Sequence, residues 1–319
     1  MPKVSVIVPV YGVEKYIERC ARSLFEQTLD NIEYLFIDDC TPDKSIEILK
    51  NILEEYPHRK NQVIIHRMEK NSGQAAVRKW GMLNATGDYI IHCDSDDWVD
   101  VTMYEKMYNK AIETGSDVVV CDYVTTDGGS LKKINKACHS VKPIEFLENM
   151  LLQRDPWSLC NKLFKRTAYY NIVFPTSAMG EDMATTMQLV WNCSKLEYIP
   201  IAYYHYYFNP DSITKKRTKE NSLRNFTQLK DNTEIVNKTF AQRSLTPKMK
   251  DGLLNLKLQV KSLLLPLVWN NEYYIMWKKL YPNLESQLYL SKSIDITTKI
   301  KYLLTRLRLY PLKKDRIKF

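Results

Sequence analysis

Three carboxylates stand within four positions at Asp94-Ser95-Asp96-Asp97, directly after the apolar run 89–93. Like charges this close repel one another unless something neutralises them. Mg²⁺ or Mn²⁺ would do so, because such hard cations typically combine one or two carboxylates with water and substrate phosphates. The alternative is a solvated loop in which Asp96 or Asp97 caps a helix that begins near Val101. The motif alone leaves both interpretations open.

The chain around this motif alternates between strand-like and helix-like patterns. The expected strands are 4–8, which Pro9 ends, 33–37, 63–66, 89–93 and 117–122, and the expected helices are 14–27, 43–56, 74–85 and 103–114. This alternation predicts the α/β class, with a mostly parallel sheet and flanking helices. Such sheets bind ligands at the carboxyl ends of their strands, so polar residues there should meet at one edge. These residues are Tyr11, Asp38, Asp39, the 71–73 turn and the 94–97 motif. Their convergence favours a functional acidic cluster.

The second half of the chain has a less regular pattern. Segment 125–133 is expected to be a flexible loop or a hairpin turn, and 195–207 one or two short strands. Helices are expected at 143–152, 183–192, 221–243, 248–269 with a break at Pro266, and 299–309. We therefore expect an α/β domain over residues 1–217, followed by a helical C-terminal region over 218–319 that ends in a basic tail.

The composition narrows the class of protein. The chain has 319 residues, enough for one large core with an appendage or for two domains. Its seven cysteines show no C-x-x-C spacing, which argues against a disulfide framework and against a zinc site. No signal peptide is visible, and the closest approach to a spanning segment, 253–269, is interrupted by Lys257 and Lys261. We expect a cytoplasmic protein, either soluble or peripheral on the inner face of the membrane.

Most of the net charge of +9 lies at the C-terminus. From residue 299 onward, eight Lys and Arg residues stand against Asp315 alone, a balance of +7. They are interleaved with apolar residues such as Ile300, Leu303 and Leu307, a pattern typical of a helix that docks on an anionic membrane surface or on a partner. A helix whose apolar side packs on the protein itself explains the pattern equally well. This interleaving argues against nucleic acid as the partner.

Five short motifs resemble those of a known family. In chain order they are Val4-Ser5-Val6-Ile7-Val8-Pro9-Val10-Tyr11, Ile37-Asp38-Asp39, Asn71-Ser72-Gly73 with Arg78, Asp94-Ser95-Asp96-Asp97 and Glu181-Asp182. Together they resemble the inverting family 2 glycosyltransferases of the GT-A fold, over residues 1 to about 215. The resemblance implies a Rossmann-like GT-A domain with a nucleotide-binding half at about 1–122 and an acceptor half at about 123–217. It also implies hexosyl or N-acetylhexosaminyl transfer from a UDP-sugar to a glycan or lipid-linked glycan, in bacterial cell-surface polysaccharide or lipid-linked oligosaccharide synthesis.

The resemblance further implies roles for single residues. Asp39 would accept a hydrogen bond from the uracil imide, with Tyr11 beside the base. Asp94 and Asp96 would form the DXD pair, in which Asp96 binds Mn²⁺ or Mg²⁺ and Asp97 or Asp94 is the further candidate ligand. Asp182 would be the catalytic base. The other implied residues are Pro9, Glu14, Asn71, Gly73, Arg78 and Ser95 at the nucleotide-sugar, and Trp98 and Glu181 on the acceptor side.

Several of these residues have an equally good structural explanation. Gly73 could belong to a helix-cap turn, Arg78 to a structural ion pair and Trp98 to ordinary packing. The chain also departs from the family at one place, because many relatives carry an arginine and a histidine just before a Ser-Ile-Thr-like segment. Here Tyr207 and Asn209 occupy those places before Ser212-Ile213-Thr214, and Lys215, Lys216 and Arg217 are the candidates to replace them.

Two other functions are compatible with these residues. One is another metal-dependent nucleotide-handling enzyme, such as a nucleotidyltransferase, and the other is a non-catalytic GT-A-like binding or scaffold subunit. The first would need a glycine- and lysine-rich triphosphate loop after the first strand, where the chain offers only Gly12 and Lys15. The sequence does not specify the sugar, the acceptor or the linkage, and it leaves a homo-oligomer open.

Overall fold

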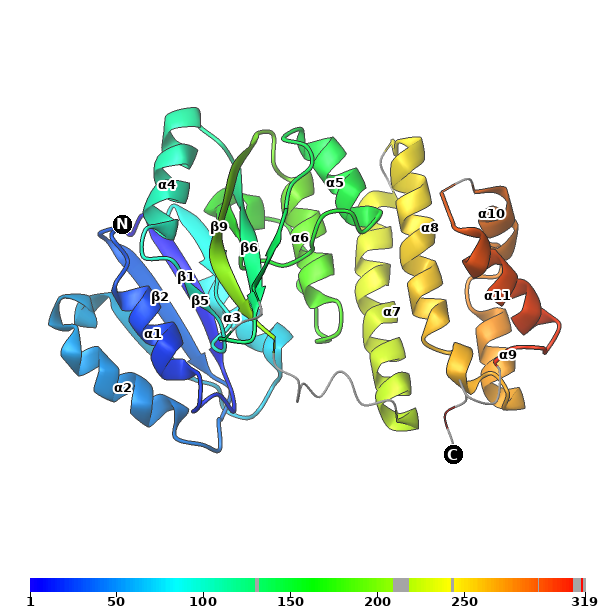
Figure 1. The fold of residues 1–319 in the computed structure, drawn as a ribbon, viewed down its shortest axis with the longest axis horizontal. Coiled ribbons are helices and arrows are strands. Elements are labelled where there is room, and N and C mark those ends of the chain that lie inside the picture. Colours follow the sequence, from blue (N-terminus) through cyan, green and yellow to red (C-terminus); the bar gives the residue numbers. More distant parts are fainter. Residues whose placement is uncertain (130–131, 209–217, 242–243, 292, 312–316, 318–319) are drawn as a thin grey trace.

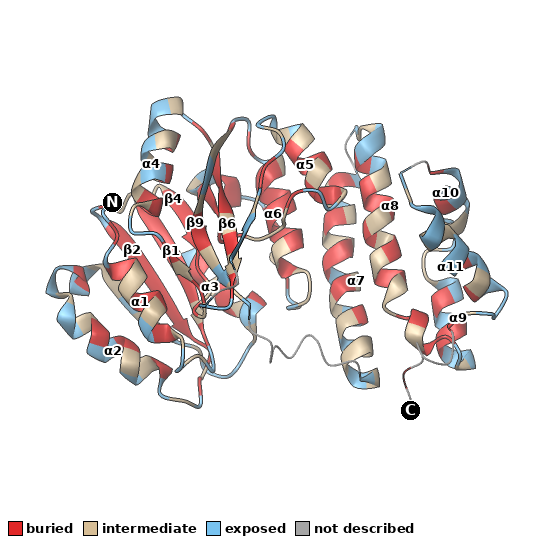
Figure 2. Ribbon diagram, viewed as in Figure 1, coloured by how far each residue is buried: buried red, intermediate tan, exposed pale blue. Residues whose placement is uncertain are grey.

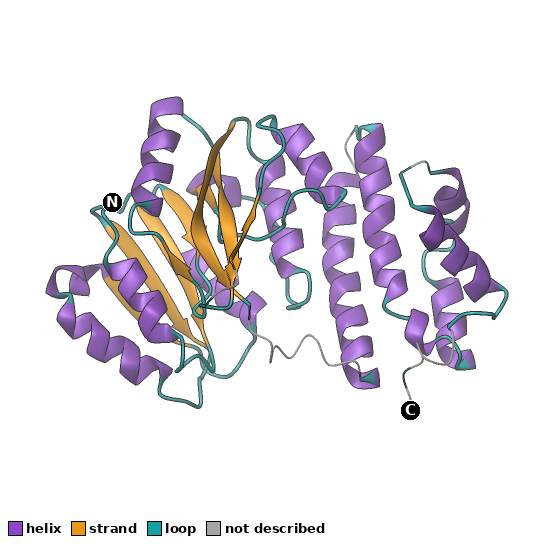
Figure 3. Ribbon diagram, in the orientation of Figure 1, coloured by secondary structure: helices purple, strands orange, loops and turns teal. Residues whose placement is uncertain are grey.

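The computed structural model describes residues 1–129, 132–208, 218–241, 244–291, 293–311 and 317. Within them, the strands, drawn in orange in Figure 3, form one mixed sheet. Their order is β3-β2-β1-β4-β8-β6-β9-β5, with β7 paired to β6. The strands are β1 (Val4–Val10), β2 (Ile32–Asp38), β3 (Val63–Arg67), β4 (Tyr89–His92), β5 (Trp98–Val99), β6 (Val118–Thr126), β7 (Lys132–Asn135), β8 (Lys162–Lys165) and β9 (Leu196–Tyr207). The predicted class, a mostly parallel sheet with flanking helices, is confirmed.

Helices cover both faces of this sheet (Figure 1). They are α1 (Ile17–Phe25), α2 (Ser45–Glu55), α3 (Gln74–Asn84), α4 (Met103–Thr114), α5 (Pro143–Leu151) and α6 (Glu181–Trp191), with short 3₁₀ helices at Pro57–Gln62 and Arg166–Tyr169. Side chains alternate along β1, so that Val6 and Val8 join one hydrophobic cluster with α1, α2 and α4 while Ile7 joins another with α3. Burial on both faces explains why the strand sequence is apolar at every position except Ser5 (Figure 2).

Several predicted boundaries need correction. Pro9 does not end the first strand, because β1 continues to Val10 and Pro9 stays in register with Ile37 of β2. Segment 195–207 is a single strand, β9, which pairs parallel to β6. The sequence pattern gave no sign of β8, a four-residue strand that enters antiparallel between β4 and β6. Segment 125–133 is a hairpin formed by the end of β6 and by β7.

A row of helices follows the sheet (Figure 1). They are α7 (Lys219–Ala241), α8 (Pro247–Ser262), α9 (Asn271–Lys279), α10 (Leu284–Leu290) and α11 (Ile296–Arg306), with a 3₁₀ turn at Leu265–Leu267 where the break at Pro266 is predicted. The sequence pattern did not indicate α9 and α10. The structure also places the last helix three residues earlier than predicted, because Asp295 accepts a hydrogen bond from the Thr298 amide and so caps its N-terminus.

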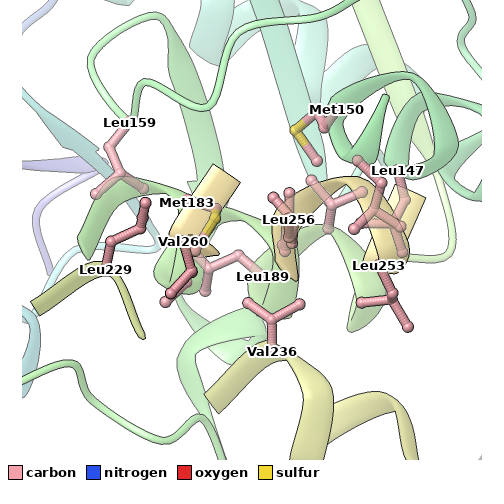
Figure 4. Close-up of a cluster of buried hydrophobic side chains, with 14 of the residues drawn as sticks. Leu147, Met150, Leu159, Met183, Leu189, Leu229, Val236, Leu253, Leu256 and Val260 are labelled. Carbon is pink, nitrogen blue, oxygen red and sulfur yellow. The ribbon is translucent and has the colours of Figure 1, made fainter. Parts of the chain in front are cut away.

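The hydrophobic core continues from the sheet into these helices. Figure 4 shows Leu147 and Met150 of α5 and Met183 of α6 in one cluster with Val236 of α7 and Leu256 of α8. At Gly252 of α8, a Cβ atom would lie 2.4 Å from the Cβ of Leu151 of α5, so only glycine lets the two helices come this close. The core therefore crosses the predicted boundary between 217 and 218. None of the helices described is long and apolar enough to cross a membrane.

Candidate active site

A cavity of about 450 Å³ opens at the carboxyl ends of the parallel strands. Its walls come from the segment after β1, the end of β2, the head of α3, the loop after β4 and the last turn of β9. Of the residues predicted for the nucleotide-sugar and the metal, the cavity brings together Pro9, Tyr11, Asp39, Asn71, Gly73, Asp94, Ser95 and Asp96. Tyr206 is a wall residue that the sequence did not single out. The cavity thus collects polar groups from five separate segments, four of which were expected from the strand-end rule.

Asp39 is a buried carboxylate with a fixed orientation. Its Oδ1 accepts a hydrogen bond from the Ser72 amide at 2.7 Å, and its Oδ2 accepts one from the Gly73 amide at 2.8 Å. These bonds join the end of β2 to the head of α3, where Gly73 has a φ of 80°, a conformation that favours glycine. Each carboxylate oxygen keeps a second lone pair, so Asp39 can still accept a hydrogen bond from a ligand.

The acidic loop after β4 divides into residues that face the cavity and one that faces away. Asp94 and Asp96 line the cavity, and burial together with the charge of Asp94 raises the pKa of Asp96 to about 6. Asp97 is buried against β9, where it accepts hydrogen bonds from the Tyr204 hydroxyl and from the Tyr207 amide, the latter at 2.7 Å. Burial raises the pKa of Asp97 well above its usual range. Asp97 therefore anchors the loop to β9 in this structure and is not among the residues that line the cavity.

The acidic loop after β4 is also held by Arg19, whose guanidinium belongs to a stack of planar side chains. Arg19 donates a hydrogen bond to the Asp96 carbonyl at 2.9 Å, and its guanidinium lies 3.7 Å from the ring centroid of Trp98. The ring of His205 also stacks on Trp98, with the two ring centroids 5.0 Å apart. Trp98 contacts Arg19 and His205 and is not among the residues that line the cavity. The sequence did not single out Arg19, because no local motif marks its contact with a residue 77 positions away.

Arg78 is the hub of a buried ion cluster. Its side chain is 1% exposed, and its Nη2 lies 2.6 Å from Asp94 while its Nη1 contacts both Glu181 and Asp182 at the head of α6. Burial alone would lower the pKa of Arg78, but the three carboxylates outweigh it and hold that pKa well above its usual value. Burial raises the pKa of Glu181 despite Arg78. Arg78 lies behind the cavity, so the structure supports the ion-pair alternative for this residue.

Asp182 differs from Glu181 in exposure. The Asp182 side chain is 36% exposed, whereas that of Glu181 is 5% exposed. Both belong to the first turn of α6, where the helix dipole favours a negative charge. Asp182 is thus a carboxylate that solvent can reach, tied through Arg78 to the acidic loop of the cavity.

Two further predicted residues lie outside the cavity wall. Glu14 is exposed and accepts a hydrogen bond from the Lys44 amide at 3.2 Å, on the outer side of the loop after β1. Asp38 is buried and pairs with Arg67 at 2.7 Å. The segment expected to contact the diphosphate, from Asn209 to Arg217, lies outside the described residues.

The cavity offers a pair of carboxylates to a metal. Asp94 and Asp96 both face it, and the pKa of Asp96 is raised first by burial and then by the charge of Asp94, a repulsion that a cation would relieve. Across the described part of the chain, no three His, Cys, Asp or Glu side chains form a ready-made metal cluster. A pair of carboxylates fits Mg²⁺ or Mn²⁺ that completes its coordination with water and substrate phosphates, and it does not fit a metal held by protein alone.

Comparison with known proteins decides the family. The glycosyl transferase family 2 profile matches residues 5–176, which is more than half of the chain. The chain belongs to glycosyltransferase family 2. This family 2 chain is 33% identical over 189 residues to an uncharacterized glycosyltransferase of Haemophilus influenzae, covering 58% of this chain and 70% of that protein. The family assignment inferred from the five sequence motifs is confirmed.

Two other curated relatives are longer than this family 2 chain. Glycosyltransferase GlyA of Streptococcus pneumoniae is 29% identical over 229 residues, which cover 68% of this chain and 32% of GlyA. A poly(ribitol-phosphate) beta-glucosyltransferase of Bacillus spizizenii is 30% identical over 217 residues, which cover 65% of this chain and 32% of that enzyme. The match thus spans about a third of the length of these two relatives.

Solved structures of other proteins share the fold. Residues 1–349 of Staphylococcus aureus TarS, solved with UDP-GlcNAc, superpose with a TM-score of 0.60 at 18% identity, covering 97% of this family 2 chain and 93% of the TarS chain. The mannosyltransferase PcManGT of Pyrobaculum calidifontis, solved with GDP-Man and Mn²⁺, gives a TM-score of 0.56 at 15% identity, covering 98% and 82%. The GT-A fold, including the helical C-terminal region, is confirmed.

Proposed function

We propose that this family 2 glycosyltransferase moves a hexosyl or N-acetylhexosaminyl group from a UDP-sugar to an acceptor hydroxyl, with inversion. One observation carries the proposal: a cavity at the strand ends holds Asp39 and the Asp94–Asp96 pair, and Arg78 links this pair to the solvent-accessible carboxylate of Asp182. These groups match the parts of the reaction, namely a nucleotide base, a diphosphate and an acceptor hydroxyl.

At the nucleotide, Asp39 accepts a hydrogen bond from the uracil imide, and Tyr11 lies against the base. The two backbone amides that hold Asp39 fix the direction of its carboxylate, so little ordering is needed when UDP binds. Pro9, Asn71, Gly73 and Ser95 line the same cavity and complete its wall. Glu14 lies outside this wall in the structure, so we assign it no contact with the nucleotide.

At the diphosphate, Asp96 is the proposed ligand of Mn²⁺ or Mg²⁺, with Asp94 as its neighbour. When bound, such a cation neutralises the charge that develops on the leaving diphosphate. Arg19 holds the Asp96 carbonyl, and the buried Asp97 ties the loop to β9, so the carboxylate of Asp96 stays directed into the cavity. Asp97 supports the loop and is not proposed as a ligand.

At the acceptor, Asp182 takes the proton of the attacking hydroxyl as general base. Arg78 positions it by contacting its Oδ1, while the same guanidinium holds Asp94. Glu181 is too buried to reach an acceptor and keeps a structural role beside Arg78. Inversion requires the base and the leaving diphosphate to lie on opposite faces of the sugar, which is the arrangement that we propose for Asp182 and the metal site.

The biological setting is also a proposal. Relatives named for poly(ribitol-phosphate) glucosylation and for minor teichoic acid biosynthesis support a role in bacterial cell-surface polymer assembly. We propose a glycan or lipid-linked glycan as acceptor, on the cytoplasmic side of the membrane.

Helix α11 supports contact with the membrane surface. Ile296, Ile300 and Leu303 form an exposed apolar stripe, at 66%, 47% and 46% exposure, and Leu307 extends it at 58%. Lys299, Lys301, Arg306 and Arg308 flank this stripe, while Lys313, Lys314, Arg316 and Lys318 lie outside the described residues. An exposed apolar stripe bordered by cations suits an anionic bilayer surface, so we propose peripheral docking through α11.

The test is a donor screen in the presence and absence of Mn²⁺. UDP-Glc, UDP-Gal, UDP-GlcNAc, UDP-GalNAc and UDP-GlcA are each incubated with the protein, and released UDP is measured. We expect metal-dependent turnover of one donor, which Asp96→Ala removes and Asp30→Ala, at an exposed position outside the cavity, retains. Absence of UDP release with every donor would favour the non-catalytic scaffold, and turnover of nucleoside triphosphates instead would favour the nucleotidyltransferase.

A further inference from the structure

A second groove lies beside the proposed acceptor side. It has a volume of about 480 Å³ and lies between the β6–β7 hairpin and the segment 153–157 that follows α5. Three of its wall residues are cations, Lys133 and Lys136 of the hairpin and Arg154 of the opposite segment. Two others are aromatic, Tyr123 and Trp157. The groove therefore combines positive charge with flat apolar surfaces.

The positive charge of this groove is not neutralised by its own acidic residue. Asp155 is buried, and it contacts the His139 ring and accepts a hydrogen bond from the His139 amide at 3.3 Å. Within the described residues, no carboxylate lies within 4.0 Å of the cationic atoms of Lys133, Lys136 or Arg154. The three cations are exposed, so they remain available to an anionic ligand.

The aromatic side of the groove is held in place. Trp157 donates its indole N–H to the Met150 carbonyl at 2.7 Å, which fixes the plane of the ring. The loop that carries Trp157 is anchored by the buried ammonium of Lys162, which donates to the carbonyls of Pro156 at 3.0 Å and Ser158 at 2.7 Å. A fixed aromatic ring beside polar groups is a common platform for a flat, partly apolar ligand such as a sugar ring.

The groove is connected to the proposed reaction centre from two directions. The carbonyl of Trp157 accepts a hydrogen bond at 2.6 Å from Thr186 of α6, one helical turn after Asp182. On the sheet, Tyr123 is in register with Tyr204 and Thr125 with Tyr206, so Tyr123 and Tyr206 lie on the same face. Tyr206 lines the donor cavity and Tyr123 lines the groove, so adjacent positions of one sheet face join the two sites.

We propose that this groove binds an acidic glycan acceptor, whose phosphodiester or carboxylate groups contact Lys133, Lys136 and Arg154 while its sugar or polyol units lie against Trp157 and Tyr123. The proposal rests on the proposed function, since it assigns the acceptor class to the same site. The repeating negative charge places successive units of the acceptor along the groove and leads one hydroxyl towards Asp182.

The test measures binding of acceptor-like oligomers to the full chain with UDP and Mn²⁺ present. The probes are a glycerol-phosphate oligomer, a polyglucuronate oligomer and a neutral β-glucan oligomer of similar length. The variant Lys133→Ala/Lys136→Ala/Arg154→Ala removes the three groove cations. The matched control Lys106→Ala/Lys132→Ala/Lys165→Ala removes the same charge from exposed lysines that do not line the groove, one of them next to Lys133.

We expect the natural protein to bind an acidic oligomer more tightly than the neutral one, with an affinity that falls as salt rises. The groove variant should lose about tenfold in that affinity and show a weaker salt dependence, while the control stays within about twofold. The stronger of the two acidic probes identifies phosphodiester or carboxylate as the recognised group. Equal affinity for acidic and neutral oligomers, or equal losses in variant and control, would overturn the proposal.

Measuring hydrolysis of the UDP-sugar in the absence of an acceptor tests the proposed reaction independently of the acceptor-binding proposal. The control triple variant should release UDP from the donor in water as fast as the natural protein does. Absence of UDP release from the natural protein would contradict the glycosyltransferase reaction itself, whereas the acceptor class is decided by the binding measurements.

Discussion

Arg78 contacts Asp182 across 104 positions of the chain, with its Nη1 against the Oδ1 of the aspartate. The other terminal nitrogen of the same guanidinium lies 2.6 Å from Asp94. A single planar cation thus fixes the distance between the acidic loop after β4 and the head of α6. Because the guanidinium is rigid and buried, it holds the proposed metal loop and the proposed base in one arrangement.

Replacing Arg78 should strongly destabilise the fold. Arg78→Met leaves Glu181 and Asp94 without their buried cation, and breaking a buried ion pair costs about 3–5 kcal/mol. The free energy of unfolding from urea denaturation measures this loss. The control is Arg22→Met, whose pairs with Glu18 and Glu55 lie at the surface, where solvent screens them, so its loss should be far smaller. Similar losses for the two variants would contradict the hub role of Arg78.

Asp39→Asn should weaken UDP binding. The oxygen of an asparagine can still accept one of the two backbone hydrogen bonds. Its NH₂ group, however, is a donor, so it cannot accept the hydrogen bond that the uracil imide N–H offers. Loss of one buried polar match costs about 1–3 kcal/mol, roughly five- to 150-fold in affinity. Calorimetry with UDP and GDP is the measurement, and Asp30→Asn is the exposed control. Equal affinity of the natural protein for UDP and GDP would refute uracil recognition.

Much of this site could be predicted from the sequence, because motifs that follow parallel strands come together at one edge of the sheet. Asp39, Gly73 and Asp96 are far apart in the chain, yet each follows a strand with a clear apolar run, so the parallel-sheet rule places them at one edge. The same rule does not tell which way a side chain points. Asp97 lies next to Asp96 but faces β9, because residues 94–97 form a tight turn in which the Asp97 amide donates a hydrogen bond to the Asp94 carbonyl at 3.0 Å.

Contacts that depend on distant partners could not be predicted. Arg19 shows no motif, and its role depends on where β5 and β9 bring Trp98 and Tyr207. Strand β8 has only four residues and lies between β4 and β6, which is a property of the assembled sheet. Lys133 and Arg154 line the same groove only because the β6–β7 hairpin lies opposite the segment that follows α5.

Lys162→Met should loosen the segment that carries Trp157. The Lys162 ammonium donates to the carbonyls of Pro156 and Ser158, and an unsatisfied buried acceptor costs about 1–3 kcal/mol. The free energy of unfolding should fall by at least about 2 kcal/mol. The control Lys165→Met, at the exposed end of the same strand, should change it by less than about 0.5 kcal/mol.

The pH dependence of the Lys162 contribution has a definite sign. Burial lowers the pKa of Lys162 to about 8, below the value of about 10.4 in an unfolded chain. Between these values the unfolded chain binds a proton that the folded protein does not, so stability rises with pH. The stability difference between the natural protein and Lys162→Met should therefore grow from pH 8 to pH 10. A constant or shrinking difference would contradict a lowered pKa.

The apolar stripe of α11 should be needed for membrane adsorption. Ile300→Glu/Leu303→Glu should abolish cosedimentation with vesicles that contain phosphatidylglycerol, and Leu83→Glu/Ile112→Glu, at exposed sites of α3 and α4, should not. Point variants are better than truncation after residue 298, because Tyr302 is buried and bonds the Leu258 carbonyl at 2.9 Å. If the natural protein did not bind these vesicles at low salt, α11 would not be a membrane-docking helix.

The turnover of Asp182→Asn tests the central claim, that this carboxylate activates the acceptor hydroxyl. The amide keeps the shape of the side chain but cannot take the proton, so kcat for transfer should fall by about 10²–10⁴-fold. Affinity for the UDP-sugar should change little, since Asp182 does not line the donor cavity. Measurement of kcat on the best donor, with calorimetry of UDP on the same sample, gives both values. A variant with near-normal kcat, or one that loses donor binding instead, would contradict the account.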